Sequence, residues 1–393
     1  MSESIVITGA ARTPMGGFQG ELSAVTAPQL GAVAIEAALS RAGIEPGDVD
    51  EVMMGCVLPA GLGQAPARQA AMGAGLPNSV PATTVNKVCG SGMKTVMVAY
   101  DQLLAGNGKI VVAGGMESMS NAPYMLTKAR DGMRMGHGQV MDHMFLDGLE
   151  DAYEPGRAMG TFAEDCASKF SFSREDQDEY ALKSLSNALQ AQEEGTFKDE
   201  IAAVEVKGRK ETVTIAEDEQ PKNARPDKIP LLKPAFKKDG SITAANASSI
   251  SDGAAALVLT TESEAQSRKL PVRAQILGHA SHAQEPGWFT AAPVPAIQKL
   301  LEKIGWSIDD VELWEVNEAF AVVPMAAMAE LGIPRDKLNI RGGACALGHP
   351  IGTSGTRIIV TLLHAMESLG LKRGVAAICI GGGEGTAIAI ERN

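Results

Sequence analysis

Cys89-Gly-Ser-Gly-Met-Lys94 and Gly352-Thr-Ser-Gly-Thr-Arg357 are two versions of one hexapeptide, and their shared context decides the fold. Each is followed by a long apolar helical pattern and then by a short apolar, strand-like run with glycines. Those runs span 109–115 and 375–383. A second match, between 41–50 and 303–312, lies in nearly the same register and has a helix before it and a strand after it in both copies. Two matches in one register and one element order indicate an internal duplication.

The duplicated pattern alternates apolar strands with helices, which predicts an α/β fold built from two similar halves. Because helical crossovers connect parallel strands, we expect mostly parallel sheets that are covered on both faces. The region between the halves has no counterpart in the second copy, so we interpret it as an inserted loop domain. The predicted domains are an N-terminal half (1–120 plus 246–270), the loop domain (121–245) and a C-terminal half (271–393).

The predicted loop domain begins with an irregular, methionine-rich stretch and continues with helical patterns over 158–170 and 174–192. Methionines more often fill cores or interfaces than form sites, and here we favour an oligomer contact. Further on, the segment 207–238 carries nine Lys/Arg against five Asp/Glu. A solvated loop is the ordinary interpretation of such a segment. The alternative is a landing site for a small polyanion such as a nucleotide phosphate.

Composition argues against several classes of protein. With 393 residues, 45% of them hydrophobic, the chain is long enough to fill a sizeable core. A formal net charge of −12 argues against general binding of nucleic acid, and no apolar run reaches the roughly 18 residues of a membrane span. Five scattered cysteines without CxxC spacing favour free thiols over disulfides or a zinc site. The chain begins without a basic region ahead of a long apolar run, so we expect a cytoplasmic location.

Cys89 is the strongest candidate for a nucleophile. It lies between a strand-like segment and an apolar helix that runs to about Leu104. At a helix N-terminus, unpaired amides and the helix dipole favour a thiolate, so we expect a lowered pKa for this thiol. A buried, inert cysteine is the alternative. A strand-to-helix turn favours the nucleophile, because it presents the side chain at the edge of a sheet where α/β proteins bind ligands.

Three further residues are expected at sheet edges of the same kind. His349 lies in the glycine-rich loop ahead of the helix that matches the Cys89 helix by duplication, so pseudo-twofold packing would bring it near Cys89. Cys379 ends an apolar strand, and Asn317 follows another and offers an amide that suits orienting water or polarising a carbonyl oxygen. A histidine in a loop is often only structural, but two thiols and an imidazole together suit a nucleophile with an acid–base relay.

Four motifs in order carry a resemblance to a known family. They are Asn86-Lys-Val-Cys89-Gly-Ser-Gly-Met, Asn317-Glu-Ala-Phe-Ala321, Gly342-Gly-Ala-Cys-Ala-Leu-Gly-His349-Pro-Ile-Gly-Thr-Ser-Gly355 and Cys379-Ile-Gly-Gly-Gly383. Over nearly its whole length the chain resembles the thiolase family, in the acetyl-CoA acetyltransferase branch. The resemblance implies the layered α/β/α/β/α thiolase fold, a loop domain that binds coenzyme A, and a homotetramer or homodimer. It also implies reversible condensation of two acetyl-CoA to acetoacetyl-CoA and CoA, with CoA as substrate and product and with no metal or redox cofactor.

The resemblance also implies a role for each motif residue. Cys89 carries the acyl group, His349 takes its proton, and Cys379 removes a proton from the methyl group of a second acetyl-CoA. One oxyanion site is assigned to His349 and a water held by Asn317, and another to the backbone amides of Cys89 and Gly381. The residues expected to bind coenzyme A are Leu149, Met159, Phe236, Ser248 and Phe320, with Lys222 or Arg225 at the nucleotide phosphates.

Two positions depart from the family pattern. Ala158 stands where many biosynthetic thiolases have histidine, which removes one polar contact to coenzyme A. Phe289 occupies a position that can hold methionine beside the acyl group, so a thiolase for longer or functionalised 3-oxoacyl-CoA, such as 3-oxoadipyl-CoA, is the alternative within the family. An NAD(P)-dependent oxidoreductase is disfavoured, because the first strand is not followed by G-x-G-x-x-G. Intact Cys89, His349 and Cys379 speak against a catalytically inactive acyl-CoA carrier.

Overall fold

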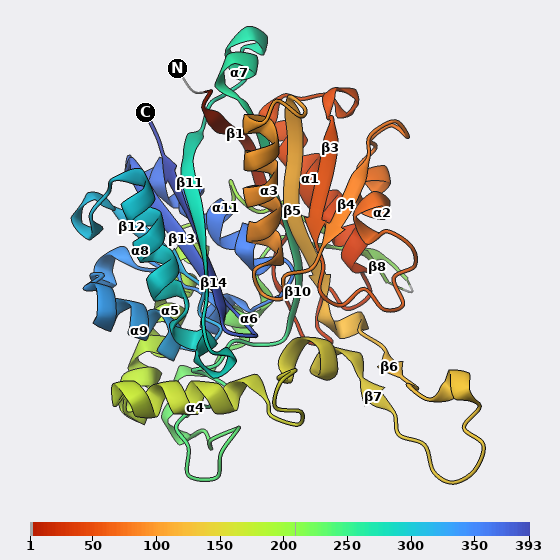
Figure 1. The fold of residues 1–393 in the computed structure, drawn as a ribbon, viewed down its shortest axis with the longest axis vertical. Coiled ribbons are helices and arrows are strands. Elements are labelled where there is room, and N and C mark those ends of the chain that lie inside the picture. The colour runs from red at the N-terminus through yellow and green to blue at the C-terminus, as the bar shows by residue number, and fades with distance from the viewer. Residues whose placement is uncertain (1–2, 209) are drawn as a thin grey trace.

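Ten strands form one mixed sheet that runs through both halves of the chain (Figure 1). The computed structural model describes residues 3–208 and 210–393, so Arg209 of the basic segment lies outside the described residues. The N-terminal half contributes β1 (Ile5–Arg12), β2 (Gly16–Gly17), β3 (Glu51–Gly55), β4 (Ala82–Val85), β5 (Ile110–Ser118) and β10 (Ser251–Thr261). The C-terminal half contributes β11 (Ala274–Ala283), β12 (Leu313–Val316), β13 (Arg373–Ile380) and β14 (Glu384–Glu391).

The order of the strands confirms the predicted duplication. Along the sheet it is β12-β13-β14-β11-β1-β10-β5-β3-β4, so the halves meet at the β11–β1 pair. Outward from that pair, the order β1, β10, β5, β3 in one half corresponds to β11, β14, β13, β12 in the other. The counterpart of β4 is reduced to a single parallel bridge between Trp314 and Leu338.

The expectation of mostly parallel sheets is wrong. Only β3–β4, β3–β5 and β12–β13 pair in parallel among the strands that the structure describes, whereas the five pairs from β5 through β10, β1, β11 and β14 to β13 are antiparallel. The physical reason is the last strand of each half, which runs back antiparallel to the strand before it. β14 follows β13 after a turn at residues 381–383, and β10 takes the same place beside β5 after the insertion.

Helices cover both faces of the sheet and form a central layer between its two halves. Neighbouring side chains in β3 and β5 alternate between two core clusters, as expected for strands buried on both faces. The outer layers are α1 (Ala27–Ala42) and α2 (Pro66–Gly73) on one half, and α8 (Pro293–Ile304) and α9 (Val322–Leu331) on the other. The central layer consists of α3 (Ser91–Leu104) and α11 (Ser354–Leu369), which share one apolar cluster with both halves of the sheet. The predicted layered α/β/α/β/α fold is therefore confirmed.

The two duplicated hexapeptides meet where α3 and α11 begin. Gly92 and Gly355 are equivalent in the duplication, and neither has room for a Cβ atom: one at Gly355 would lie 2.3 Å from Met93 N. Thr356 Oγ1 donates a hydrogen bond of 2.8 Å to Gly92 O across this contact. The close approach of two glycines therefore brings the two helix starts together, as pseudo-twofold packing predicts.

The insertion between β5 and β10 contains the remaining ribbons and several helices. The helices are α4 (Met159–Phe170), α5 (Arg174–Glu193) and α6 (Glu219–Asn223), and the ribbons pair β6 (Tyr124–Met125) with β7 (Met141–Asp142) and β8 (Val204–Lys207) with β9 (Thr212–Ile215). The predicted helices at 158–170 and 174–192 are confirmed. Ser173 and Asp176 form a capping box that explains why α5 begins at Arg174.

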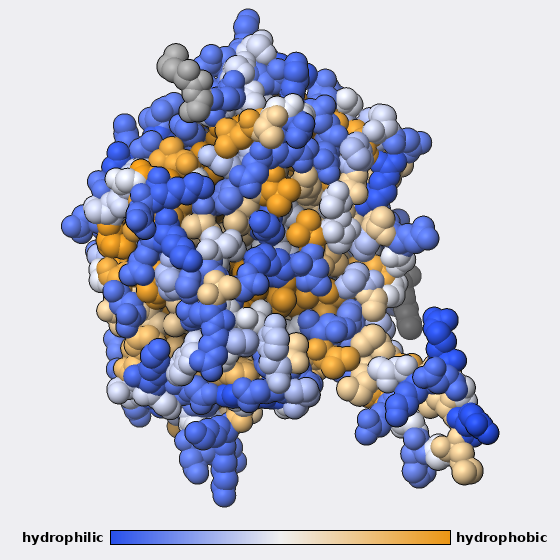
Figure 2. All heavy atoms as spheres, in the orientation of Figure 1, coloured by the Kyte–Doolittle hydropathy of each residue, from blue (hydrophilic) through white to orange (hydrophobic). Residues whose placement is uncertain are grey.

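The methionine-rich stretch leaves the body of the molecule as an extended arm, at the lower right of Figures 1 and 2. The arm runs from β6 to β7, and Figure 2 shows both hydrophilic and hydrophobic residues on it. Met133 and Met135 are exposed on the arm, with Met135 97% exposed, whereas Met116 and Met119 are buried in the body. Two short helices, α7 (Glu262–Arg268) and α10 (Ala344–Leu347), complete the fold. None of the helices in the described ranges is both long and apolar enough to cross a membrane.

Candidate active site

A cavity of about 440 Å³ lies between the insertion and residues from both halves of the sheet. Its walls are mostly apolar, which is typical of sites that bind small molecules. The lining includes eight of the residues that the sequence singles out: Cys89, Leu149, Met159, Phe236, Ser248, Phe320, His349 and Gly381. Ala158 and Phe289, the two departures from the family pattern, also line it. Segments that lie far apart in the sequence therefore converge on one cavity.

The turn between β4 and α3 holds Cys89 in a strained, well-defined position. Val88 has a φ of 46°, which a β-branched residue rarely adopts. Two side chains stabilise this conformation: Asn86 Oδ1 accepts from Val88 N at 2.9 Å, and Ser91 Oγ donates to Val88 O at 2.6 Å. A Cβ atom at Gly90 would lie 2.4 Å from Ile380 Cδ1, so any larger residue here would displace that buried side chain. Such strain is common at functional sites, where the surrounding structure maintains it.

The expected lowering of the Cys89 pKa is wrong for the free protein. Burial raises the pKa of Cys89 to about 11, although the backbone N–H groups of Gly381 and of Cys89 itself lower it. The helix begins at Ser91, two residues after the cysteine, so Cys89 lies outside the first helical turn. The helix dipole falls off within that turn. Cys89 is therefore a protonated thiol that needs a base.

His349 is placed as a neutral imidazole with one free nitrogen. Its Nδ1 lies 2.6 Å from Ser354 Oγ, and that hydroxyl donates to Pro350 O at 3.0 Å, so Ser354 accepts the proton of Nδ1. In this tautomer Nε2 carries a lone pair, and it has no hydrogen-bond partner among the described residues. Burial, and then the charge of Arg357, lower the pKa of His349 to about 3. His349 is therefore neutral at physiological pH and able to accept a proton at Nε2.

Asn317 directly follows β12 and is held by its backbone. Its N–H donates to Ala377 O at 2.9 Å, which continues the pairing of β12 with β13. The side chain is buried, yet neither Oδ1 nor Nδ2 has a hydrogen-bond partner in the described part of the chain. Buried amides are nearly always paired. An unpaired one after a strand, like the free Nε2 of His349, indicates a polar group awaiting a substrate or water.

Cys379 lies on β13, one residue before the strand ends, and it is fully buried. Burial raises the pKa of Cys379, and the neighbouring Cys89 raises it further. The structure therefore brings the two thiols close enough for their charges to oppose each other. Cys379 is not one of the residues that line the cavity, whereas Gly381, two residues later, is.

The residues predicted to bind coenzyme A fall into two groups. Phe236 and Phe320 meet edge to face, with ring centroids 6.1 Å apart, and form part of the cavity wall with Leu149, Met159 and Ser248. The basic pair lies apart from this wall. Lys222 Nζ is paired with Glu21 Oε1 at 3.1 Å, whereas Arg225 lines a second cavity of about 350 Å³ that shares Ala244 and Ser249 with the first.

Sequence reasoning missed the ion pair between Lys87 and Glu384, which lies beside the site. Lys87 precedes Cys89 by two residues, and Glu384 follows the glycine turn that begins at Gly381. The ion pair therefore ties the Cys89 turn of one half to the Gly381 turn of the other. The only signals in the sequence were a charge within the Cys89 motif and another directly after the Cys379 motif, which do not reveal that the two charges are partners.

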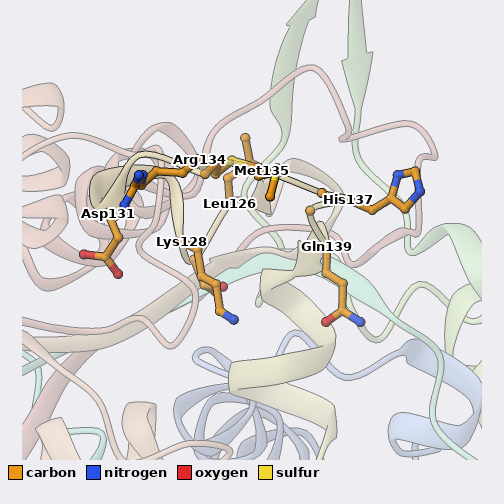
Figure 3. A pocket seen from close by; sticks show the side chains of 11 residues that line it. Leu126, Lys128, Asp131, Arg134, Met135, His137 and Gln139 are labelled. Atoms are coloured by element: carbon orange, nitrogen blue, oxygen red, sulfur yellow. The ribbon is translucent and has the colours of Figure 1, made fainter.

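A hollow within the arm does not contain this set of groups among its described lining residues. This hollow has a volume of about 570 Å³. Figure 3 shows the arm side chains that line it, among them Leu126, Arg134, Met135 and His137. The hollow holds no cysteine. Within residues 3–208 and 210–393, no group of three or more His, Cys, Asp or Glu side chains is arranged to hold a metal ion.

A thiol and a neutral imidazole that face one apolar cavity, in a layered α/β fold, define the class: an enzyme with a cysteine nucleophile. The family model described as the thiolase N-terminal domain matches residues 5–263, and the thiolase C-terminal domain matches residues 270–392. The chain therefore belongs to the thiolase family, whose members are acyltransferases.

Individual relatives are similar to this chain over nearly its full length. It is 51% identical over 391 residues to acetyl-CoA acetyltransferase 2 of Arabidopsis thaliana, covering 98% of this chain and 96% of that protein. The crystal structure of the Bacillus anthracis acetyl-CoA acetyltransferase superposes with a TM-score of 0.96 at 42% identity, covering 99% of both chains. The crystal structure of a thiolase from Ascaris suum in complex with coenzyme A superposes with a TM-score of 0.94 at 42% identity, covering 99% of this chain and 100% of that one.

Proposed function

We propose that this protein is an acetyl-CoA C-acetyltransferase that reversibly condenses two acetyl-CoA to acetoacetyl-CoA and CoA. The observation that carries the proposal is the pair of Cys89 and His349 in one apolar cavity, with Nε2 of His349 free and the N–H of Gly381 facing the sulfur. The names of the relatives support the same substrate, because those compared above at 42–51% identity include acetyl-CoA acetyltransferases from a plant and a bacterium.

The first half-reaction forms a thioester on Cys89. His349 Nε2 accepts the thiol proton as the sulfur attacks the carbonyl carbon of acetyl-CoA. The C–S bond to CoA then breaks, and the CoA thiolate takes the proton from His349. A neutral base is needed because the Cys89 pKa lies near 11, so few of the molecules carry a thiolate at pH 7. The backbone N–H groups of Cys89 and Gly381 are suited to stabilise the oxyanion of the acyl-enzyme.

The second half-reaction forms the carbon–carbon bond. Cys379 first gives its thiol proton to the neutral His349, because burial keeps this thiol protonated in the free protein. The resulting thiolate removes a proton from the methyl group of a second acetyl-CoA, whose enolate oxygen is stabilised by protonated His349 and by a water that Asn317 orients. The carbanion attacks the Cys89 thioester carbonyl, the C–S bond to Cys89 breaks, the proton on Cys379 passes to the Cys89 sulfur, and His349 returns its proton to Cys379. The two thiols and the imidazole supply every proton transfer, so the proposed reaction uses no metal or redox cofactor, and CoA is only a substrate and product.

Coenzyme A is proposed to enter across the insertion. The apolar wall formed by Leu149, Met159 and Phe236 suits the pantetheine arm, together with Ser248 and Phe320. Arg225 is the better of the two candidates for the nucleotide phosphates, because the ammonium group of Lys222 is already paired with Glu21. Most of these groups belong to the proposed loop domain (121–245), whereas Ser248 and Phe320 come from the two halves that carry the chemistry.

A short acyl group is proposed because the ring of Phe289 forms part of the cavity wall. Its ring is 3% exposed and packs edge to face on Phe162, at 6.1 Å, so it has little room to move away from a longer chain. Thiolysis of acetoacetyl-CoA should therefore exceed that of 3-oxohexanoyl-CoA and 3-oxoadipyl-CoA in kcat/KM. A Phe289→Ala variant should narrow this difference. A wild-type preference for either longer substrate would instead support the alternative thiolase.

We also propose a homotetramer or homodimer, in the cytoplasm. The exposed apolar side chains of the arm support assembly, since a two-stranded ribbon is marginally stable without further packing. All five cysteines are free, and a reaction that depends on the thiols of Cys89 and Cys379 suits a reducing compartment.

The decisive experiment is mass spectrometry after treatment with acetyl-CoA. An increase of about 42 Da, the mass of an acetyl group in a covalent intermediate, should map to the peptide that contains Cys89. A Cys379→Ala variant should still acquire this label and lose condensation. Absence of the label from wild-type Cys89 would show that the proposed function is wrong.

A further inference from the structure

Glu117 is a fully buried carboxylate that binds both halves of the molecule directly behind the active site. It lies on β5, in the N-terminal half, opposite Gly253 of β10. Its Oε2 accepts from Val57 N and from Gly352 N, each at 2.9 Å, and its Oε1 accepts from Leu58 N at 3.1 Å. Cys56 Sγ lies 3.7 Å from Oε1. One side chain therefore fixes backbone from the loop after β3 and from the His349 loop of the other half.

These two loops form the surroundings of the reacting groups. Val57 and Leu58 belong to an apolar cluster with Ile351, and Cys89 packs against that cluster. Gly352 lies three residues after His349 and two before Ser354, whose hydroxyl holds Nδ1 of that histidine. A shift at Gly352 N therefore moves the histidine, and a shift at Val57 moves the wall behind the thiol.

Close packing leaves this contact little freedom. A Cβ atom at Gly115 would lie 2.1 Å from Gly352 O, and one at Gly55 would lie 2.7 Å from the same oxygen. The backbones of the two halves thus touch through glycines, and Glu117 supplies the polar bonds at that contact. A neutral glutamine has the same size as glutamate, but its NH₂ group would face N–H donors that now point at a carboxylate oxygen.

Burying the acid of Glu117 carries an energetic cost. No Lys, Arg or His side chain in the described ranges forms an ion pair with Glu117, and burial raises its pKa to about 7 although the three backbone N–H groups lower it. Burying an acid without a cation is unfavourable unless hydrogen bonds compensate. Charge-assisted bonds to backbone N–H groups are among the stronger ones and impose a specific geometry.

We propose that Glu117 is a positioning residue for acyl transfer, which sets the relative placement of Cys89 and His349 by holding their two loops in one buried contact. The proposal rests on the proposed function, in which the proton of Cys89 passes to His349. Glu117 does not line the cavity, so it acts through the loops and not on the substrate.

Glu117→Gln tests the proposal, with Glu164→Gln as the matched control. Glu164 is also a buried glutamate that accepts from backbone N–H groups, those of Ser241 and Ile242, but these lie outside the active-site loops. In Glu117→Gln we expect the single-turnover rate of Cys89 acetylation and kcat to fall about 10- to 100-fold, the effect of misplacing reacting groups by about 1 Å. The KM for acetyl-CoA should stay within about twofold. Glu164→Gln should acetylate Cys89 within about twofold of the wild-type rate.

Rates are compared per folded active site, from circular dichroism and from the final extent of Cys89 labelling, so that loss of folded protein does not count as loss of rate. If Glu117→Gln does not fold, Glu117→Asp serves, since a carboxylate one methylene shorter keeps the charge and loses the reach to both loops. The inference is wrong if the folded variant acetylates Cys89 at the wild-type rate, or if Glu164→Gln shows the same loss. Absence of labelling in the wild type would contradict the proposed function instead.

Discussion

At the scale of the residue, burial affects the pKa of Cys89 more strongly than the nearby start of a helix does. The backbone N–H groups that face its sulfur stabilise a thiolate, but removal from water destabilises it more, and the pKa of Cys89 rises to about 11. The imidazole of His349 is shifted in the opposite direction, to a pKa of about 3, by the same cause. Both groups are therefore neutral over the whole physiological range, and the proton moves only when substrate is present.

The pH dependence of alkylation tests this state. Because the fraction of thiolate grows tenfold per pH unit below the pKa, the rate at which iodoacetamide modifies Cys89 in the free enzyme should keep rising from pH 7 through pH 10. Labelling is measured by mass spectrometry of the Cys89 peptide. An unstructured peptide with one internal cysteine is the control, and its rate should level off above the ordinary cysteine pKa of about 8.5. A plateau for Cys89 below pH 8 would mean that the thiol is activated before substrate binds.

At the scale of the element, the pair of α3 and α11 depends on two glycines. In Gly355→Ala the new Cβ atom would lie 2.3 Å from Met93 N, and backbone cannot move aside as a side chain can. We expect the free energy of unfolding to fall by about 1–3 kcal/mol or more, the usual range for an overpacked core. The measurement is chemical denaturation followed by circular dichroism. Gly47→Ala is the control, because a Cβ atom there meets nothing within 4 Å, and it should be nearly neutral.

The sequence was sufficient for the elements whose signals are local. The helices α4 and α5 begin within one residue of the predicted positions, because caps and periodicity are written in adjacent residues. The duplication also predicted that the loops of Cys89 and His349 would meet. Antiparallel pairing in the middle of the sheet was not predictable in this way, because strand direction depends on which distant strand becomes the neighbour.

The residues at the active site also differ in whether a local sequence signal predicts them. The motifs that contain Cys89, His349, Cys379 and Gly381 are recognisable because the family pattern preserves them in order. Glu117 has no such signal beyond being one acid in an apolar strand, since its partners are backbone N–H groups that every residue has. The pKa of Cys89 was mispredicted because the sequence does not show how deeply the turn is buried.

At the scale of the whole molecule, the arm is a surface without a partner within the described chain. Met135 is 97% exposed and Leu126 is 51% exposed, although both are apolar. Exposed apolar groups at the tip of an extended ribbon are typical of protein interfaces. We therefore place the main oligomer contact of the proposed homo-oligomer on the arm.

Substituting Leu126 and Met135 together by aspartate should shift the protein to a smaller assembly, because like charges would be brought together in the contact. The assembly is measured by size-exclusion chromatography with light scattering. The control is Leu369→Asp, which changes a side chain of similar exposure at the end of α11, and should leave the mass unchanged. An unchanged mass in the double variant would show that the arm does not hold the assembly together.

The position of β1 at the junction of the two halves also governs the order in which the chain can fold. The neighbours of β1 in the sheet are β10 and β11, which begin at Ser251 and Ala274. While the chain is being synthesised, β1 therefore has neither neighbour until about two thirds of the protein has left the ribosome. Such long-range closure slows folding and leaves unpaired strand edges exposed in the meantime. The nascent chain should accordingly depend on chaperones over this interval, and the pairing of β1 with β10 is the step that ends it.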